Sequence, residues 1–307
     1  MTGKYILVLK IALCCTGALF PVFFCHCSRQ SEGTQNRLIV YVSIPPQKYF
    51  VEKIGGDICS VRTLIPLGAS PHTFEPKPSQ MAALGKASCY FAIGVEMEEV
   101  WLPKIRRLCP ELKIVPTDSG IIKRPMERAI DPGDRDEDIH HENHRHHGDD
   151  PHIWLSPDLV KLQAKTIAGA LAEIDTAHAT LYYERSKAFE TQVDSVRLHI
   201  AGMLEECHAP GSFMAFHPSW GYFADAFSLR QVAVEMEGKE PGIRQLGRIV
   251  ALAKQEGIRT VLVQPQFSTR TAQTIAEELG GTTVVADPLA EDWARNLERV
   301  AGVLCGR

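Results

Sequence analysis

The fold is decided first by residues 37–65, which read RLIVYVSIPPQKYFVEKIGGDICSVRTLI. The β-branched run Arg37–Ser43 predicts a buried strand, and Tyr49–Gly55 has the apolar spacing of a helix. A second apolar run, Cys59–Ile65, predicts another strand. A strand, a helix and a strand joined by short loops indicate an α/β fold with parallel pairing.

The same alternation continues along the chain on both sides of its middle. The pattern predicts helices over 79–85, with Ser79 as its N-cap, and over 97–107, 243–255 and 269–279, and strands over 89–93, 113–116, 212–216, 231–235, 260–264 and 282–286. A helix of roughly 30 residues, Thr176–Cys207, would span about 45 Å, which is longer than one small domain needs. We therefore expect two lobes, each a mostly parallel sheet flanked by helices, joined by one long rigid helix.

Length and composition set the domain organisation. A chain of 307 residues exceeds what one hydrophobic core usually serves, and a net charge of -4 gives no bias toward nucleic acid. The expected division is a signal peptide at 1–27, an N-terminal lobe at 36–175, a linking helix at 176–208 and a C-terminal lobe at 209–307.

The N-terminus has the pattern of an export signal. Lys4 and Lys10 accompany a short apolar run, Ile11–Phe24, and no acidic residue occurs before Glu32. Fourteen residues are too few to span a bilayer comfortably. We expect export to the periplasm; the cleavage site and a membrane-tethered form stay open.

Nine cysteines occur, and four of them lie in the signal region. The other five have no CxxC spacing and indicate neither a zinc ribbon nor a dense disulfide scaffold: Cys59, Cys89, Cys109, Cys207 and Cys305. Cys207 and Cys305 could pair in an oxidising compartment, or all five could be free buried thiols.

A histidine-rich tract precedes the second half of the chain. Residues 131–150 form an acidic and histidine-rich stretch whose length and composition predict a mobile functional loop. Its imidazoles could bind metal weakly, as an auxiliary set: His140, His141, His144, His146 and His147.

Four other residues share one context. His72, His152, His217 and Asp287 each open a turn after an apolar run, and each has a proline beside it. Open α/β sheets place ligand sites at the carboxyl ends of strands, where such turns lie. Three imidazoles and one carboxylate satisfy a tetrahedral zinc ion, so the four predict a metal site.

The segments around these residues resemble a known family. They read SPHTFEP (70–76), DPHIWLSP (150–157), FHPSWGYF (216–223) and DPL (287–289). In this order they are similar to the signature stretches of the metal-specific solute-binding proteins of ABC transporters, which bind zinc or manganese. The resemblance implies two α/β lobes with the metal in the cleft between them.

The resemblance also implies ligands and partners. His72 and His152 match the ligands of the first lobe, and His217 and Asp287 match those of the second. Glu75 and Gln266 are expected beside the ligands. A histidine at 217 and a histidine-rich loop before the second ligand, His152, are typical of zinc members. The expected protein is therefore a monomeric high-affinity Zn²⁺ receptor that serves an ABC permease and its ATPase subunit.

Other functions remain as alternatives at this point. A manganese receptor and a surface adhesin occur in the same family. A zinc hydrolase would use three histidines and a metal-bound water, but the sequence contains no HExxH, nucleophile elbow or phosphate loop. The expected protein is therefore a binding protein and not an enzyme.

Overall fold

The computed structural model describes residues 37–127, 148–235, 241–267 and 269–307. The expected signal peptide and most of the expected loop, including its five auxiliary histidines, lie outside these ranges. Residues 36–307 form one compact unit. Within the described ranges, no helix combines the length and the apolar character needed to cross a membrane.

The first sheet has four parallel strands in the order β2-β1-β3-β4. They are β1 (Leu38–Val42), β2 (Cys59–Thr63), β3 (Cys89–Ala92) and β4 (Lys113–Pro116), with helices α1 (Pro45–Gly55), α2 (Pro78–Leu84) and α3 (Glu96–Leu108) between them. From β1 the chain adds β2 on one side of the sheet, and then adds β3 and β4 on the other side, so the order of strand addition reverses between β1 and β3. Ligand sites of open parallel sheets lie at this position, beyond the carboxyl ends of the strands.

The second sheet repeats the arrangement, in the order β6-β5-β7-β8. Its strands are β5 (Ser212–Ala215), β6 (Arg230–Ala233), β7 (Thr260–Val263) and β8 (Thr282–Val285), with helices α6 (Gly221–Ala226), α7 (Ile243–Gln255) and α8 (Arg270–Glu278). The expected fold of two parallel-sheet lobes is confirmed.

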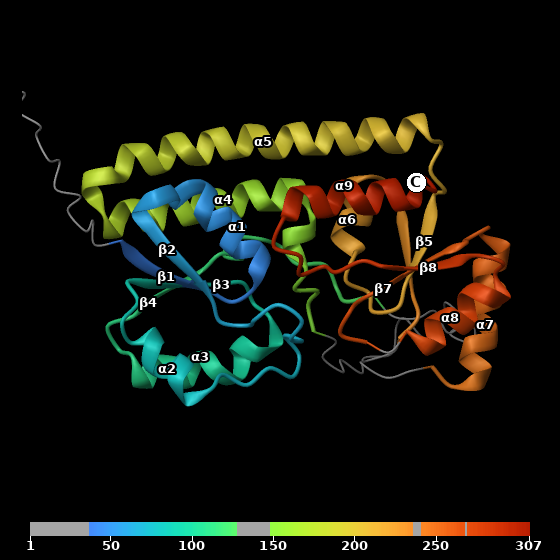
Figure 1. Ribbon diagram of the computed structural model, residues 1–307, viewed down its shortest axis with the longest axis horizontal. Helices are drawn as coiled ribbons and strands as arrows, with labels where there is room; N and C mark the ends of the chain where they lie inside the picture. The colour runs from blue at the N-terminus through green and yellow to red at the C-terminus, as the bar shows by residue number, and fades with distance from the viewer. Residues whose placement is uncertain (1–36, 128–147, 236–240, 268) are drawn as a thin grey trace, which may run out of the picture. The chain divides into compact units, whose positions relative to one another are not determined.

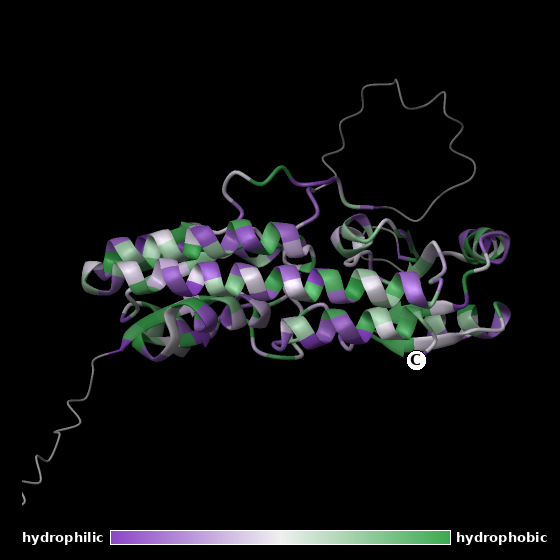
Figure 2. Cartoon of the chain, turned by 90° about the horizontal axis from the view of Figure 1, so that it is seen from above, coloured by the Kyte–Doolittle hydropathy of each residue, from purple (hydrophilic) through white to green (hydrophobic). Residues whose placement is uncertain are grey.

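One long helix spans both lobes and packs against one helix from each. Helix α5 (Ala179–Glu206) runs along α4 (Pro157–Ile174) and α9 (Trp293–Leu304), as Figure 1 shows. At 28 residues it is about 42 Å long. Its buried side chains recur every three or four residues, and Figure 2 shows polar and apolar residues alternating along the helix. One continuous core under these helices includes residues of both sheets.

Two indole hydrogen bonds join the C-terminal lobe to the segment that contains His152. The Trp154 Nε1–H donates to the Pro288 carbonyl at 2.7 Å, and the Trp293 Nε1–H donates to the Trp154 carbonyl at 2.6 Å. Both indoles are buried, so these bonds are shielded from water. The turn that follows β8 is thereby held against the segment that contains His152.

Two helix starts differ from the sequence prediction. Helix α1 begins at Pro45 rather than near Tyr49, and α2 begins at Pro78 with Lys77, not Ser79, at its N-cap. Proline lacks an N–H and has a fixed φ, and both properties suit the first turn of a helix. Helix α4 likewise begins with a proline, Pro157, and the Ser156 hydroxyl caps it by accepting from the Leu159 amide at 3.4 Å.

Helix α9 is absent from the sequence prediction. Its buried residues are Trp293, Asn296, Leu297, Val300, Ala301 and Leu304, a spacing that fits one helix face. The Asp292 side chain accepts from the Arg295 amide and caps the helix. The spacing and the cap are local signals from which α9 could have been predicted. The helix was missed because it follows the last predicted strand.

The five cysteines that follow the signal region form one disulfide and leave three free thiols. Cys207, directly after α5, is bonded to Cys305, directly after α9, with a Cα–Cα distance of 5.6 Å. Cys59, Cys89 and Cys109 are free and buried. The disulfide joins the ends of two helices that already pack together, across a sequence separation of 98.

We expect this disulfide to stabilise the C-terminal half. Closing a loop of that length restricts the unfolded chain, and replacing both cysteines by serine should lower the free energy of unfolding by roughly 2–5 kcal/mol. Denaturant unfolding measures the effect. Reductant should lower the midpoint of the parent protein and leave the double variant unchanged. Equal midpoints for the two proteins without reductant would contradict the expectation.

Candidate metal centre

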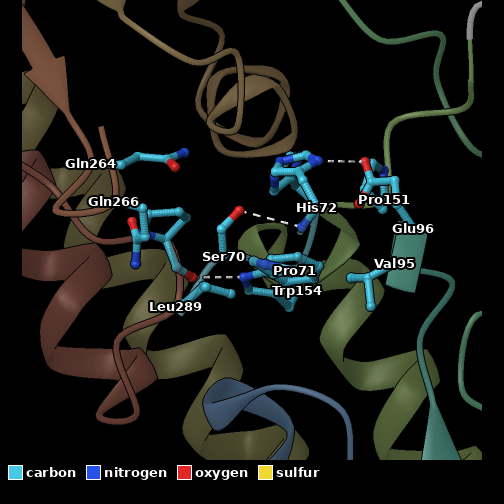
Figure 3. Close-up of a pocket in the computed structure, with 12 residues that line it drawn as sticks. Ser70, Pro71, His72, Val95, Glu96, Pro151, Trp154, Gln264, Gln266 and Leu289 are labelled. Carbon is cyan, nitrogen blue, oxygen red and sulfur yellow. Dashed lines mark hydrogen bonds and ion pairs between the residues drawn. The ribbon is translucent and has the colours of Figure 1, made fainter. Parts of the chain in front are cut away.

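His72 lies on the loop that follows β2. Its backbone N–H donates to the Ser70 hydroxyl at 3.3 Å, and its Nδ1 pairs with Glu96 Oε1 at 3.1 Å, as Figure 3 shows. Burial lowers the His72 pKa, but the hydrogen bond and charge of Glu96 outweigh it and raise this pKa overall. Burial raises the Glu96 pKa, yet the His72 contact and charge bring it down to about 2. The pair therefore contains an ionised carboxylate.

His152 is held by a carboxylate two residues before it. The Asp150 Oδ1 accepts from the His152 backbone N–H at 3.0 Å and lies 2.7 Å from the His152 Nδ1. The Asp150 side chain is 1% exposed and the His152 side chain 7%. A carboxylate that deeply buried fixes the orientation of the ring it contacts.

His217 lies two residues after the end of β5 and is held by a carboxylate from the end of the neighbouring strand. Its Nδ1 lies 2.6 Å from the Oε1 of Glu235, which follows β6, and both side chains are buried. Burial lowers the His217 pKa, and the charge of His152 lowers it further, against the opposing effect of Glu235. The His217 Nε2 is buried and has no hydrogen-bond partner among the described residues.

The three imidazoles meet at one place between the lobes. The ring centroids of His72 and His217 are 4.9 Å apart, and those of His152 and His217 are 5.3 Å apart. Two imidazoles that share a tetrahedral zinc ion at ~2.1 Å have ring centres roughly 5 Å apart. In the described ranges, no three His, Cys, Asp or Glu side chains are arranged to hold a metal ion as they stand. The spacing of the rings suits a shared ion, and their ligating atoms would have to turn toward it.

The other predicted residues occupy different positions. Asp287 is half-buried, and its Oδ1 accepts from the Leu289 amide at 2.9 Å; the two residues after it line the pocket, and its own side chain is not among the lining groups. Gln266 lines the pocket, and both polar atoms of its side chain are buried without a partner in the described part of the chain. Glu75 is exposed. Figure 3 shows Gln266 and His72 on opposite sides of the pocket.

Sequence reasoning missed the three carboxylates that hold the imidazoles. Glu96, Asp150 and Glu235 each contact one histidine Nδ1. A signal existed for two of them. Asp150 stands inside the quoted DPH segment, and Glu235 is the last residue of a predicted strand. Pairing Glu235 with His217 required the strand order of the second sheet, which places β6 beside β5.

A buried polar network supports the loop after β3. The Glu98 carboxylate accepts from the Ser43 hydroxyl and from the amides of Ile93 and Gly94, at 3.0 and 2.7 Å for the amides. The Tyr90 hydroxyl contacts Ser43 at 2.5 Å. Glu98 thereby fixes the turn that leads into Val95, which lines the pocket, and into the carboxylate that holds His72.

The fold and the site together define a class of protein. Two parallel-sheet lobes joined by one long helix, with the His217 ring of the second lobe beside the His72 and His152 rings of the first, are the architecture of the two-lobed solute-binding proteins that have a metal site between their lobes. The model of the family described as zinc-uptake complex component A, periplasmic (ZnuA), matches residues 40–300. The chain belongs to this family, as the sequence motifs predicted.

Individual relatives agree with the family match. The chain is 26% identical over 277 residues to the zinc-binding lipoprotein AdcA of Streptococcus pneumoniae strain R6, covering 89% of this chain and 54% of that protein. It therefore spans about half the length of that relative. A crystal structure of ZnuA has a TM-score of 0.79 at 38% identity, covering 88% of this chain and 99% of that one. A zinc-bound deletion mutant of ZnuA has a TM-score of 0.78 at 39% identity, with coverage of 88% and 97%.

We expect Glu98 to make stability depend on pH. Burial raises the pKa of Glu98 from 4.5 to about 7, although its hydrogen bonds lower it. Between these values the folded state binds a proton that the unfolded state has lost, so this group's contribution to stability falls as pH rises from about 4.5 to about 7 and is level above that. The Glu98→Gln variant lacks this loss, and its stability relative to the parent should increase across that range.

Unfolding midpoints at pH 5, 6, 7 and 8 measure this difference. Glu99→Gln, at the exposed neighbouring position, is the matched control and should track the parent at every pH. A constant offset between Glu98→Gln and the parent would show that burial does not govern this carboxyl.

Proposed function

We propose that the protein is the high-affinity zinc receptor of an ABC importer, which captures Zn²⁺ outside the inner membrane and delivers it to the permease. The observation that carries the proposal is the buried His217 Nε2, which has no partner in the described chain and belongs to a ring that packs beside two further imidazoles. A buried polar atom without a partner costs free energy, and a bound ion would remove that cost.

The carboxylates make the imidazoles suitable ligands. A carboxylate at Nδ1 holds the proton of a neutral ring on that nitrogen, which leaves the Nε2 lone pair for a metal. Each of the three histidines has such a partner. Three nitrogen donors favour zinc over manganese, which prefers oxygen. The zinc ion is the cargo, and the protein binds and releases it without a chemical step.

The names of the relatives support the same cargo. The family is a component of zinc-uptake complexes, AdcA is a zinc-binding lipoprotein, and one ZnuA structure contains zinc. Since this chain spans about half of AdcA, the support concerns the shared part alone.

The organisation around the receptor is part of the proposal. Residues 1–27 direct export to the periplasm, the lobes comprise 36–175 and 209–307, and the helix at 176–208 joins them. The protein acts as a monomer with a permease and its ATPase subunit. The auxiliary histidines, His140, His141, His144, His146 and His147, supply weak binding near the main site.

Zinc stoichiometry tests the receptor directly. The mature chain and a variant lacking residues 130–147 should each retain one tightly bound zinc, and His217→Ala should lose it, because the deletion leaves all three clustered imidazoles in place. Metal analysis after dialysis against a weak chelator gives the stoichiometry. The deletion ends before Gly148 because the Gly148 carbonyl accepts from the Met126 amide.

His178→Ala is the matched control for this test. His178 also pairs with a carboxylate through Nδ1, at 2.7 Å from Asp175, but its ring packs against Tyr182 and not against the three clustered imidazoles. It should retain the zinc. If tight binding disappears with the loop and His217→Ala has no effect, the interlobe site is not the receptor site.

Asp287 is proposed as the fourth ligand. Its position directly before two residues that line the pocket, Pro288 and Leu289, supports this assignment. Asp287→Asn should weaken zinc binding by more than about tenfold in a competition titration. Glu291→Gln, which removes a nearby carboxylate paired with Lys48, is the control. Unchanged affinity in Asp287→Asn would assign the fourth position to another donor.

A further inference from the structure

The Asp150 carboxylate is buried and only half satisfied. Its side chain is 1% exposed; Oδ1 contacts the His152 backbone N–H and Nδ1. Its Oδ2 is buried and has no hydrogen-bond partner among the described residues. A buried carboxylate costs several kilocalories per mole unless a cation compensates its charge.

Arg124 is placed to compensate this charge. Its Nε lies 4.0 Å from the Asp150 Oδ2, and its backbone carbonyl accepts from the Asp150 amide at 2.8 Å. The Tyr222 hydroxyl joins the same two residues: it accepts from the Arg124 N–H at 3.0 Å and donates to the Asp150 carbonyl at 3.0 Å. Arg124 and Asp150 are therefore fixed together through backbone and side chain.

The second lobe holds the guanidinium in place. The Arg124 Nη1 donates to Asp225 Oδ2 at 3.0 Å, and its Cζ lies 5.9 Å from the centre of the Tyr222 ring. Both partners belong to α6. A Cβ at Gly221, the first residue of α6, would lie 2.4 Å from Nη1, so the guanidinium occupies the space that a side chain there would fill.

We propose that Arg124 is a positioning residue for the metal site, which acts through Asp150 on His152. Its positive charge stabilises the Asp150 carboxylate, and that carboxylate holds the Nδ1–H tautomer of His152 and directs Nε2 toward the ion. Because Asp225 and Gly221 lie in the second lobe, the orientation of a first-lobe ligand depends on the position of α6. The inference rests on the proposed zinc-binding function.

A double-mutant cycle tests the pathway. Zinc competition titrations compare the parent with Arg124→Met, Asp150→Asn and the double variant. Loss of a group that orients a ligand lowers metal affinity by about 10–100-fold. We expect a roughly tenfold loss for Arg124→Met, a larger loss for Asp150→Asn, and no further loss in the double variant. Independent, multiplying losses would overturn the proposal.

Three further variants separate positioning from general stability. Arg124→Lys retains the charge and should restore most of the affinity. Gly221→Ala displaces the guanidinium without removing it and should weaken binding even if Arg124→Met fails to fold. Arg185→Met removes an arginine of similar exposure, 28% against 25%, that pairs with Asp57, and should bind zinc like the parent.

The tautomer of His152 gives a readout that does not depend on zinc. Imidazole ¹⁵N shifts of the metal-free protein, assigned with a His152→Asn variant, should show the Nδ1–H tautomer in the parent and a tautomer mixture in Arg124→Met. An unchanged His152 signal would refute the role of Arg124. If the parent shows the expected tautomer but binds no zinc, the proposed function fails and the positioning contact stands.

Discussion

The site depends on how the two lobes are held against each other, and two indole hydrogen bonds set much of that contact. Trp154 donates to Pro288, and Trp293 donates to Trp154, so the segment after His152 and the turn after Asp287 share one buried junction. A continuous core beneath α4, α5 and α9 extends this junction along the molecule. Close packing and buried hydrogen bonds keep the two lobes in one relative position. Three imidazoles from distant segments are therefore held close together.

Within this frame, each imidazole has the same local arrangement. A carboxylate contacts Nδ1 of His72, His152 and His217, and each carboxylate comes from a different structural context. The environments are unequal. His72 is one-third exposed and its pKa is raised, whereas His217 is buried and its pKa is lowered. A buried neutral imidazole and a more accessible one suit a site that must both retain an ion and admit it.

The parallel sheets explain why the clustered imidazoles and their carboxylates come from such separate parts of the chain. His217 and Glu235 follow neighbouring strands, and their side chains meet because parallel strands end at the same edge. Asp150 and Arg124 are brought together differently. They flank Asp149 and Pro125, which form an isolated antiparallel bridge. The connection from α6 through Arg124 to His152 would link the second lobe to a ligand of the first.

The sequence alone determined the repeated strand–helix alternation, the long helix and the three histidines, because hydrophobic periodicity, proline and turn residues are local signals. It also determined the family, through four ordered motifs. Only the tertiary structure decided which carboxylate holds each imidazole, that Cys207 pairs with Cys305, and that Arg124 faces a buried Asp150. These contacts join residues that are distant along the chain or depend on burial, and burial is a property of the packed molecule that no short stretch of sequence carries.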